Sequence, residues 1–241
     1  MTAAIEMRDV SAGYAGVPVL RGVDLHVSTG EVVALLGGNG AGKTTTLLTL
    51  AGILPSEAGD VRALGEPVRA GRPHVQARRG IALVPDDRSL FFNLTTRENL
   101  RLARTPKGTS HADVEALVLD YFPALKPKLG VRAGLLSGGE QQMLAVGRAM
   151  VTQPKVLMID ELSMGLAPIV VTQMLPIVRR IAVELGAGVL LVEQHIDLVL
   201  QHSDRAYVLN RGRVVLEGTA ADLLADKAQL RSSYLAMEVA S

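Results

Sequence analysis

The sequence predicts an α/β protein with a central parallel β-sheet. Continuous apolar runs, typical of strands buried on both faces, are EVVALLG, IALVP, KVLMID and GVLLVE, beginning at residues 31, 81, 155 and 188. The stretches between these runs include helical segments, which parallel strands need as crossover connections. Apolar alternation near the N-terminus is a further observation, because it predicts a separate small β layer.

The N-terminal part of the chain is predicted to combine short strands with one helix. β-like runs cover residues 5–10, 23–27 and 61–64, and we expect them to form an antiparallel subdomain beside the parallel sheet. TTTLLTLAGIL, at residues 44–54, predicts a helix. This helix directly follows the buried strand at 31–37, so strand, loop and helix are continuous.

The middle of the chain, residues 95–151, is mainly helical in pattern. Apolar residues at the spacing of one helix face are Met143, Leu144, Gly147, Met150 and Val151. This spacing predicts a helical subdomain inserted into the α/β core. We therefore expect one domain over residues 1–241, with the core and the β layer in residues 1–94 and 152–241.

The C-terminal part is predicted to hold a helix and a hairpin. Residues 169–185 predict a helix, in which Pro176 predicts a kink or a break because proline lacks the N–H that a helix needs. AYVLNRGRVVLEG, at residues 206–218, predicts a β-hairpin that turns at Asn210-Arg211-Gly212.

The composition is that of a folded protein without a dominant charge. Of 241 residues, 48% are hydrophobic and 20% are charged, and the formal net charge is +1. This balance, together with 3 Phe, 4 Tyr and no Trp, argues against nucleic acid as a partner. The lack of cysteine excludes disulfides and thiolate metal sites. No apolar run approaches the about eighteen residues of a membrane span, so we expect any membrane role to depend on a partner.

A glycine-rich loop predicts a phosphate site between the first buried strand and the helix after it. Gly37, Gly42, Lys43 and Thr44 satisfy the pattern G-x-x-x-x-G-K-[ST]. Glycines let backbone N–H groups turn toward phosphates, Lys43 can reach the β and γ phosphates, and Thr44 offers its hydroxyl to Mg²⁺. The alternative is a glycine-rich turn without a ligand, which the strand, lysine and threonine together disfavour. The predicted nucleotide-contacting residues of this segment are Gly37, Asn39, Gly40, Ala41, Gly42, Lys43, Thr44 and Thr45.

Two carboxylates follow the apolar run at residues 156–159. Asp160 is predicted to hold the magnesium shell. Glu161 is predicted to orient the attacking water and to polarise it as a general base. Alternatively, Asp160 only caps the segment after the strand. Because the same chain also has a phosphate loop, the role at the metal is favoured.

LSGGEQQ, at residues 136–142, predicts a second anion site. Ser137, Gly138 and Gly139 directly precede a helix, whose N-terminus attracts anions. A chain with one phosphate loop has no obvious need for a second phosphate-binding site of its own. The nucleotide of a second copy of the chain, or of a related chain, could use this site. The alternative is a serine N-cap with a glutamate in the first helical turn.

The phosphate loop, LSGGEQQ and the IDE strand, in this order, resemble the nucleotide-binding subunit of an ABC (ATP-binding cassette) protein over essentially the whole chain. The resemblance implies a P-loop NTPase (RecA-like) core and head-to-tail pairing of two subunits. Each ATP then lies between one phosphate loop and the LSGGE segment of the other subunit, where Ser137 and Gly139 act in trans. The resemblance also implies that Tyr14 stacks on adenine and that His195, in LLVEQH, contacts the γ-phosphate.

Three positions depart from the common ABC pattern. Asp86 replaces the usual glutamine that touches magnesium and the attacking water, so we expect it to act at the metal and to slow or re-tune hydrolysis. Leu162 replaces a proline and Ala167 replaces an aspartate. The alanine removes a polar contact across the expected dimer.

Several segments are similar to the shorter ATPase of branched-chain amino acid importers. They are VPDDRSLFFNLTTRENL, RAGLLSGGEQQML, SMGLAP, AYVLNRGRVVLEGT and a YLA near the C-terminus. Importers of urea and short amides use nearly the same subunit. The resemblance implies transmembrane permease subunits, a second ABC ATPase as partner in a homo- or heterodimer, and indirectly a solute-binding protein. It also implies a cytoplasmic location on the inner face of the membrane. The permease is then expected to contact residues 86–100 and a helix N-terminal to LSGGE.

Two alternative functions remain open. One alternative is a soluble ABC ATPase that acts on ribosomes or DNA. The single cassette, and the about ninety residues between Lys43 and Ser137, too few for a long coiled-coil arm, weigh against it. Another alternative is an exporter ATPase for lipid or polysaccharide. The arginine-rich residues 69–80 predict a solvated helix face rather than a site for lipid or nucleic acid.

Overall fold

The computed structural model describes residues 3–194 and 196–226. Its strands are β1 (Ala3–Tyr14), β2 (Val17–Ser28), β3 (Val32–Leu36), β4 (Ser56–Ala63), β5 (Glu66–Pro67), β6 (Ile81–Val84), β7 (Val156–Asp160), β8 (Gly188–Glu193), β9 (Arg205–Asn210) and β10 (Arg213–Thr219). Its α-helices are α1 (Lys43–Leu50), α2 (Pro73–Arg79), α3 (Thr96–Arg101), α4 (His111–Tyr121), α5 (Gly138–Met150), α6 (Pro168–Leu185), α7 (Ile196–Leu200) and α8 (Ala220–Ala225). Short 3₁₀ helices cover Pro123–Lys128 and Ala133–Leu135.

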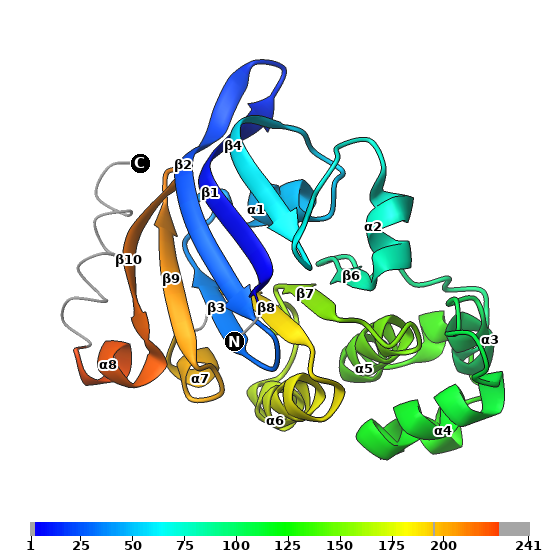
Figure 1. The fold of residues 1–241 in the computed structure, drawn as a ribbon. Helices are drawn as coiled ribbons and strands as arrows, with labels where there is room; N and C mark the ends of the chain where they lie inside the picture. The colour runs from blue at the N-terminus through cyan, green and yellow to red at the C-terminus, as the bar shows by residue number, and fades with distance from the viewer. Residues whose placement is uncertain (1–2, 195, 227–241) are drawn as a thin grey trace.

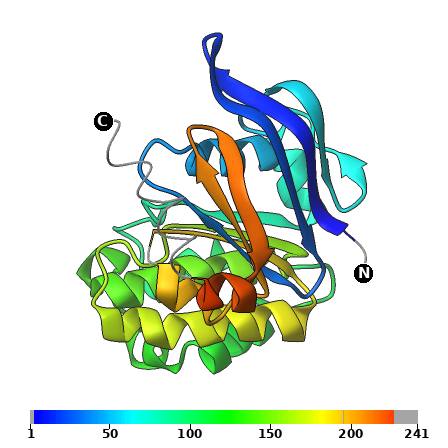
Figure 2. The same ribbon diagram turned by 90° about the vertical axis from the view of Figure 1, so that its left-hand side faces the viewer.

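The larger sheet has the strand order β10-β9-β3-β8-β7-β6 and is parallel except for β10. Helices α5 and α6 lie along one face, and the antiparallel strands β1 and β2 lie on the other (Figures 1 and 2). Strand β3 therefore contributes alternate side chains to two cores: Val32, Ala34 and Leu36 to one, and Val33 and Leu35 to the other. Coverage of both faces explains the continuous apolar runs and confirms the predicted α/β class.

The smaller sheet is antiparallel, with the order β2-β1-β4-β5, and it confirms the predicted N-terminal β layer. Its strands extend well beyond the runs predicted at residues 5–10 and 23–27. An irregularity in the pairing of β1 near Asp9, whose φ is 49°, places Arg8 and Asp9 both on the exposed side. This interrupts the alternation of buried and exposed side chains from which the length of the strand was predicted.

Helix α6 runs across Pro176 without a break, so of the two outcomes predicted there the break is wrong, and the kink stays a prediction. Pro176 and Thr172 are both exposed. The carbonyl of Thr172 lacks a helical hydrogen-bond partner because Pro176 has no backbone N–H. Water can take the place of the missing hydrogen bond, and the apolar side chains of α6 hold the helix on the sheet. Within the described residues, no helix is long and apolar enough to cross a membrane.

The arginine-rich segment contributes helix α2. Arg69, Arg72 and Arg78 are exposed, in keeping with a solvated face. Arg79 differs, because its guanidinium donates to the backbone carbonyls of Ala63, Glu66 and Pro67. It thereby fastens α2 to the turn between β4 and β5.

Helices α3, α4 and α5 form the predicted helical segment beside the sheet (Figure 1). Capping boxes at Thr95 and Ser110 begin α3 and α4. Gly147 lets α5 approach α4 closely, since a Cβ there would lie 2.7 Å from Cγ1 of Val118. The division of the chain at residues 95 and 151 stays a prediction.

Gly147→Ala is expected to lower the free energy of unfolding by about 1–2 kcal/mol, because the methyl group overpacks the contact with Val118. Alanine is otherwise the better helix former by about 1 kcal/mol, so a helix-propensity effect alone has the opposite sign. Urea denaturation measures the difference. Gly130→Ala is the matched control, since a Cβ there meets open space and its φ is not positive. A Gly147→Ala protein as stable as the parent contradicts the packing argument.

Candidate functional site

The site lies where neighbouring parallel strands end. Strand β8 lies between β3 and β7, so the segments after all three meet at one edge of the sheet. The glycine loop at 37–42 follows β3, Asp160 and Glu161 lie at the end of β7, and Gln194 follows β8. Residues far apart in sequence thus come together at the carboxyl edge, which is where parallel α/β sheets bind ligands.

The backbone of the glycine loop has contacts that a larger side chain would disturb. Gly42 has φ of 109° at the N-cap of α1, and a Cβ there would lie 2.7 Å from Leu20. The loop is supported from behind by the β9–β10 turn, where Gly212 donates its N–H to the carbonyl of Ala41 at 2.9 Å. A Cβ on Gly37 would lie 2.6 Å from the carbonyl oxygen of Leu209.

Lys43 is folded back into the loop and is only 5% exposed. Its ammonium donates to the carbonyl oxygens of Gly37 at 2.8 Å and Gly38 at 3.1 Å. It also lies 3.6 Å from a carboxylate oxygen of Glu161. A buried cation is therefore held at the centre of the loop, beside the two carboxylates.

Thr44 and Asp160 join the loop to β7. The hydroxyl of Thr44 donates to Oδ2 of Asp160 at 2.9 Å, while the buried Oδ1 has no hydrogen-bond partner. Burial raises the pKa of Asp160 to about 6, with smaller contributions from Glu161 and Asp86. An unpartnered, buried carboxylate oxygen next to a hydroxyl fits a hard divalent cation.

No group of three or more acidic or histidine side chains within residues 3–194 and 196–226 is arranged to hold a metal alone. Mg²⁺ is commonly bound by one or two carboxylates together with the phosphates of a nucleotide. The Thr44–Asp160 pair is a donor set of that kind.

Glu161 adopts an unusual backbone conformation, with φ of 47°. Its carboxylate accepts a hydrogen bond from Nε2 of Gln194 at 2.6 Å, and the same amide contacts Asn39 at 3.0 Å. Gln194 was not singled out from the sequence, although it lies within the LLVEQH string. The loop after Glu161 is also held from β8, because Ser163 donates its N–H and hydroxyl to the fully buried Glu193.

The segment after β6 places Asp86 on the exposed side of the site, where it still contributes to the raised pKa of Asp160. Arg88, two residues on, was missed as a functional residue. Its guanidinium donates to Gln142 at 2.8 Å, to Gln141 at 3.0 Å and to the carbonyl of Met164 at 3.3 Å. It ties together three segments: the loop after β6, helix α5 and the loop after Glu161.

Ser137, Gly138 and Gly139 lie at the start of α5. Ser137 is the N-cap in a capping box with Glu140, as the alternative interpretation of this string predicts. Within the described part of the chain, no hydrogen bond or ion pair joins these residues to the glycine loop of the same chain. The structure brings together the loop, Asp160 and Glu161, and leaves the LSGGE segment apart from them.

The remaining predicted residues lie at the periphery. Tyr14 ends strand β1 with 47% of its surface exposed, as a residue that contacts a ligand requires. His195 lies outside the described residues. Of the departures from the common pattern, Leu162 is fully buried and Ala167 is the N-cap of α6, without a side-chain capping bond.

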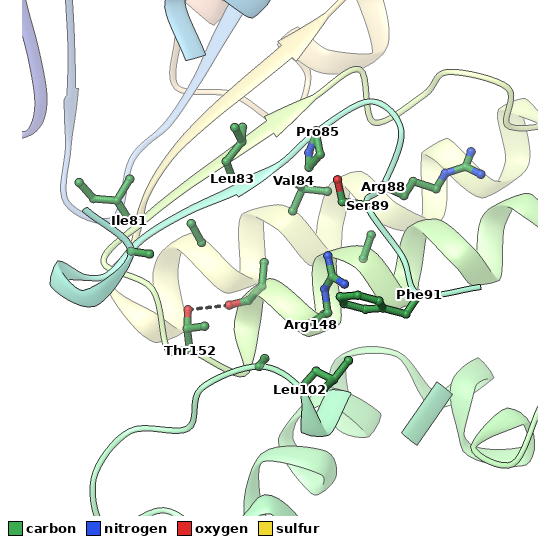
Figure 3. A pocket seen from close by; sticks show the side chains of 15 residues that line it. Ile81, Leu83, Val84, Pro85, Arg88, Ser89, Phe91, Leu102, Arg148 and Thr152 are labelled. Atoms are coloured by element: carbon green, nitrogen blue, oxygen red, sulfur yellow. Dashed lines mark hydrogen bonds between the residues drawn. The ribbon is translucent and has the colours of Figure 1, made fainter. Parts of the chain in front are cut away.

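A second concavity of about 440 Å³ lies away from the glycine loop (Figure 3). Residues from α2, β6, the loop after β6, the end of α3 and helix α5 line it. They are Ala77, Ile81, Ala82, Leu83, Val84, Pro85, Arg88, Ser89, Phe91, Leu102, Ala103, Ala145, Arg148, Ala149 and Thr152. The lining is mostly apolar and contains arginine as its only charged residue type.

The chain is similar to known proteins over most of its length. A family model described as ABC transporter matches residues 20–163. The chain is 42% identical over 228 residues to the high-affinity branched-chain amino acid transport ATP-binding protein BraG of Pseudomonas aeruginosa, covering 94% of this chain and 97% of that protein. It is 31% identical over 231 residues to the lipopolysaccharide export system ATP-binding protein LptB of Escherichia coli, covering 93% of this chain and 94% of that protein. A solved ATP-binding subunit of an ABC transporter superposes with a TM-score of 0.82 at 30% identity, covering 98% of this chain and 99% of that one.

Asp160→Asn is expected to raise the free energy of unfolding of the nucleotide-free protein at pH 7 by about 2 kcal/mol, because it removes a buried charge. The same substitution is expected to abolish magnesium-dependent nucleotide hydrolysis. Denaturant titration and phosphate release measure the two effects. Asp60→Asn, at a side chain that is 46% exposed, serves as the control, with a stability change within about 0.5 kcal/mol. A destabilised Asp160→Asn protein contradicts the argument.

Arg88→Ala is expected to lower the free energy of unfolding by about 1–3 kcal/mol, because it leaves buried Gln142 without its partner. Amide hydrogen exchange at residues 137–142 is expected to accelerate, since the start of α5 loses its tie to the loop after β6. Arg97→Ala, which breaks an exposed ion pair with Glu115, is the control, with an effect of about 1 kcal/mol or less. Unchanged exchange at residues 137–142 contradicts this link.

Proposed function

The chain belongs to the ABC transporter family, in which it is an ATP-hydrolysing subunit, and we propose that it energises a membrane importer of branched-chain amino acids or related amide-type solutes. The observation that carries the ATPase chemistry is the contact of Thr44 with buried Asp160 beside Lys43 and Glu161. The importer assignment is supported by the 42% identity to BraG, which exceeds the 31% identity to the exporter subunit LptB.

Thr44 and Asp160 are proposed to hold Mg²⁺, with Asp86 close enough to act on the same metal. The ion supplies charge neutralisation at the phosphates when it is bound. The unpartnered Oδ1 of Asp160 supports this assignment. Because Asp86 is shorter than the glutamine common in the family and negatively charged, we expect it to slow or re-tune hydrolysis without abolishing it.

The glycine loop is proposed to bind and orient the phosphates through the N–H groups of residues 37–45 and through Lys43. The lysine exchanges its contacts with the loop carbonyls for phosphate oxygens when ATP binds. Glu161 accepts a proton from the attacking water, whose oxygen forms a bond to the γ-phosphorus. The bond from that phosphorus to the β–γ bridging oxygen breaks. Gln194, which holds the Glu161 carboxylate, positions this base.

A second ATPase subunit is proposed to complete each ATP site. Ser137 caps helix α5, and within the described residues Ser137, Gly138 and Gly139 make no hydrogen bond or ion pair with their own glycine loop, so they are free to face the nucleotide of a partner. The partner is a second copy or a related ATPase. Tyr14 is proposed to stack on the adenine, and His195 to contact the γ-phosphate.

The mostly apolar groove of Figure 3 is proposed to receive the permease. Its lining includes Ser89 and Phe91, which belong to the region 86–100 expected to contact the membrane subunits, and helix α5. This contact would hold the ATPase on the cytoplasmic face of the membrane, and a solute-binding protein would act on the same importer from the other side.

Glu161→Gln is expected to slow hydrolysis by about 10²–10⁴-fold, because it removes the general base. ATP binding persists, so the variant is expected to accumulate as an ATP-bound dimer at saturating Mg-ATP. Light scattering after gel filtration measures the mass with and without nucleotide. Glu57→Gln, at an exposed glutamate, is the control and should hydrolyse ATP like the parent. A Glu161→Gln protein that stays monomeric, with and without its partner, contradicts the sandwich mechanism.

Purification of the tagged protein in mild detergent from its own cells tests the importer assignment. Mass spectrometry is expected to find multi-span membrane proteins, a second related ATPase and a solute-binding protein, whose bound solute identifies the substrate. Membrane and periplasmic components of a lipid or polysaccharide exporter would overturn the importer assignment. Ribosomal or DNA-associated proteins without any membrane protein would overturn the transport function altogether.

A further inference from the structure

Strand β8 ends in a carboxylate to which the proposed hydrolysis gives no role. The side chain of Glu193 is fully buried, with 0% of its surface exposed. Its Oε1 accepts the backbone N–H of Ser163 at 2.7 Å, and its Oε2 accepts the Ser163 hydroxyl at 2.6 Å. Oε2 also accepts the backbone N–H of Gln194 at 3.2 Å. Because a carboxylate withdrawn from water costs free energy unless it is hydrogen-bonded, these donors help to offset the cost of burying it.

Both partners of this carboxylate belong to segments that hold Glu161. Ser163 lies two residues after Glu161, in a loop closed by the N–H of Met164, which donates to the carbonyl of Glu161 at 3.0 Å. Gln194 donates its side-chain amide to the carboxylate of Glu161 at 2.6 Å. Through one carboxylate, Glu193 therefore contacts the loop that carries Glu161 and the residue that binds the Glu161 side chain.

The backbone of Glu161 needs such support. Its φ of 47° lies in the left-handed region, which a residue with a Cβ occupies only where the surrounding structure imposes it. The N–H of Glu161 donates to the carbonyl of Val192 at 3.0 Å, which fastens this residue to β8. Two residues later, Ser163 is fastened to the end of the same strand by Glu193. The loop is thus held to β8 at two successive points, and the position of Glu161 depends on both.

We propose that Glu193 is a positioning residue for ATP hydrolysis, because it sets where the carboxylate of Glu161 lies through Ser163 on one side and Gln194 on the other. The proposal rests on the proposed function, in which Glu161 is the general base. The rest of β8, Gly188–Val192, consists of glycine and buried apolar residues. An apolar residue at position 193 would continue this pattern without the cost of a buried charge, so the carboxylate serves to fix its partners in one arrangement.

Ser163→Ala tests this role, because it removes the hydroxyl that Glu193 accepts and leaves the backbone N–H in place. Glu161 is then held less firmly in its productive position, so we expect kcat to fall about 10- to 100-fold. The KM for ATP is expected to stay within about twofold of the parent's, because the glycine loop is unchanged. Steady-state phosphate release measures both constants. A Ser163→Ala protein with the kcat of the parent overturns the proposal.

Two matched variants accompany this measurement. Ser163→Thr keeps the hydroxyl and is expected to retain most of the kcat of the parent. Ser203→Ala also removes a serine hydroxyl that makes a hydrogen bond, in this case to the carbonyl of Val199 at 2.9 Å. Ser203 lies at the opposite edge of the large sheet, where its neighbour Asp204 donates its N–H to Val32 at the start of β3. Ser203→Ala is therefore expected to hydrolyse ATP like the parent.

Combination with Glu161→Gln separates positioning from a general loosening of the site. If Ser163 acts through Glu161, its substitution has nothing left to misplace once the base is removed. Single-turnover hydrolysis by the double variant is expected to match that of Glu161→Gln within about twofold. A further fall of about tenfold or more in the double variant shows that Ser163 acts elsewhere, and it overturns the proposal.

Glu193→Gln changes the positioning residue itself. It keeps the shape of the side chain but replaces one acceptor oxygen by an N–H donor, so it cannot accept all three hydrogen bonds. We expect a fall in kcat of the same size as for Ser163→Ala, and again no further fall in the Glu161→Gln background. An affinity for Mg-ADP equal to that of the parent shows that the variant is folded.

The outcomes separate this proposal from the proposed function. If Glu161→Gln hydrolyses ATP like the parent, the proposed general base is wrong and the positioning role fails with it. If Glu161→Gln is slow while Ser163→Ala and Glu193→Gln match the parent, the general base stands and the positioning role of Glu193 is wrong.

Discussion

The segments at the carboxyl edge of the large sheet meet around one buried charge, the carboxylate of Asp160 at the end of a strand whose residues are all buried. One of its oxygens accepts the Thr44 hydroxyl, and the other has no partner. A carboxylate in such a place costs free energy, which the folded protein tolerates because Lys43 lies nearby and because the sheet holds both residues rigidly. The proposed binding of Mg²⁺ recovers this cost, so the proposed metal site is preorganised at the expense of stability.

The glycine loop and the carboxylate of Glu161, the proposed general base, are both supported by residues from elsewhere in the sequence. The turn at Gly212 holds the loop from behind, and Gln194 bridges Asn39 to Glu161 in front. Each support comes from a strand that neighbours β3, or from the hairpin that continues such a strand. The nucleotide site is therefore a property of the sheet order, because only adjacent strands bring these segments within hydrogen-bonding distance.

Helix α5 begins at the LSGGE segment, which is proposed to face a partner, and it also lines the groove proposed to receive the permease. Ser137 caps its N-terminus where a partner's nucleotide is proposed to bind, and Arg148 lies in the groove near its other end. These residues are eleven positions apart, or about 16 Å along a helix. Arg88 binds the same helix in between and also reaches Met164, in the loop after Glu161. Arg88 thereby joins helix α5 to the loop after β6 and to the loop after Glu161.

The sequence alone determined the α/β class and the antiparallel layer, and it predicted the residues of the nucleotide site. Strands buried on both faces require continuous apolar runs, and phosphate binding requires glycines, a lysine and a hydroxyl at fixed spacing. Local patterns failed where a tertiary contact overrides them: at Asp9, where an irregular pairing breaks the alternation, and at Pro176, where packing on the sheet keeps α6 continuous. Only the tertiary structure decided the contacts of Gln194, Gly212 and Arg88. Their partners are remote in sequence, and which of them meet depends on strand order and helix packing, which no local pattern encodes.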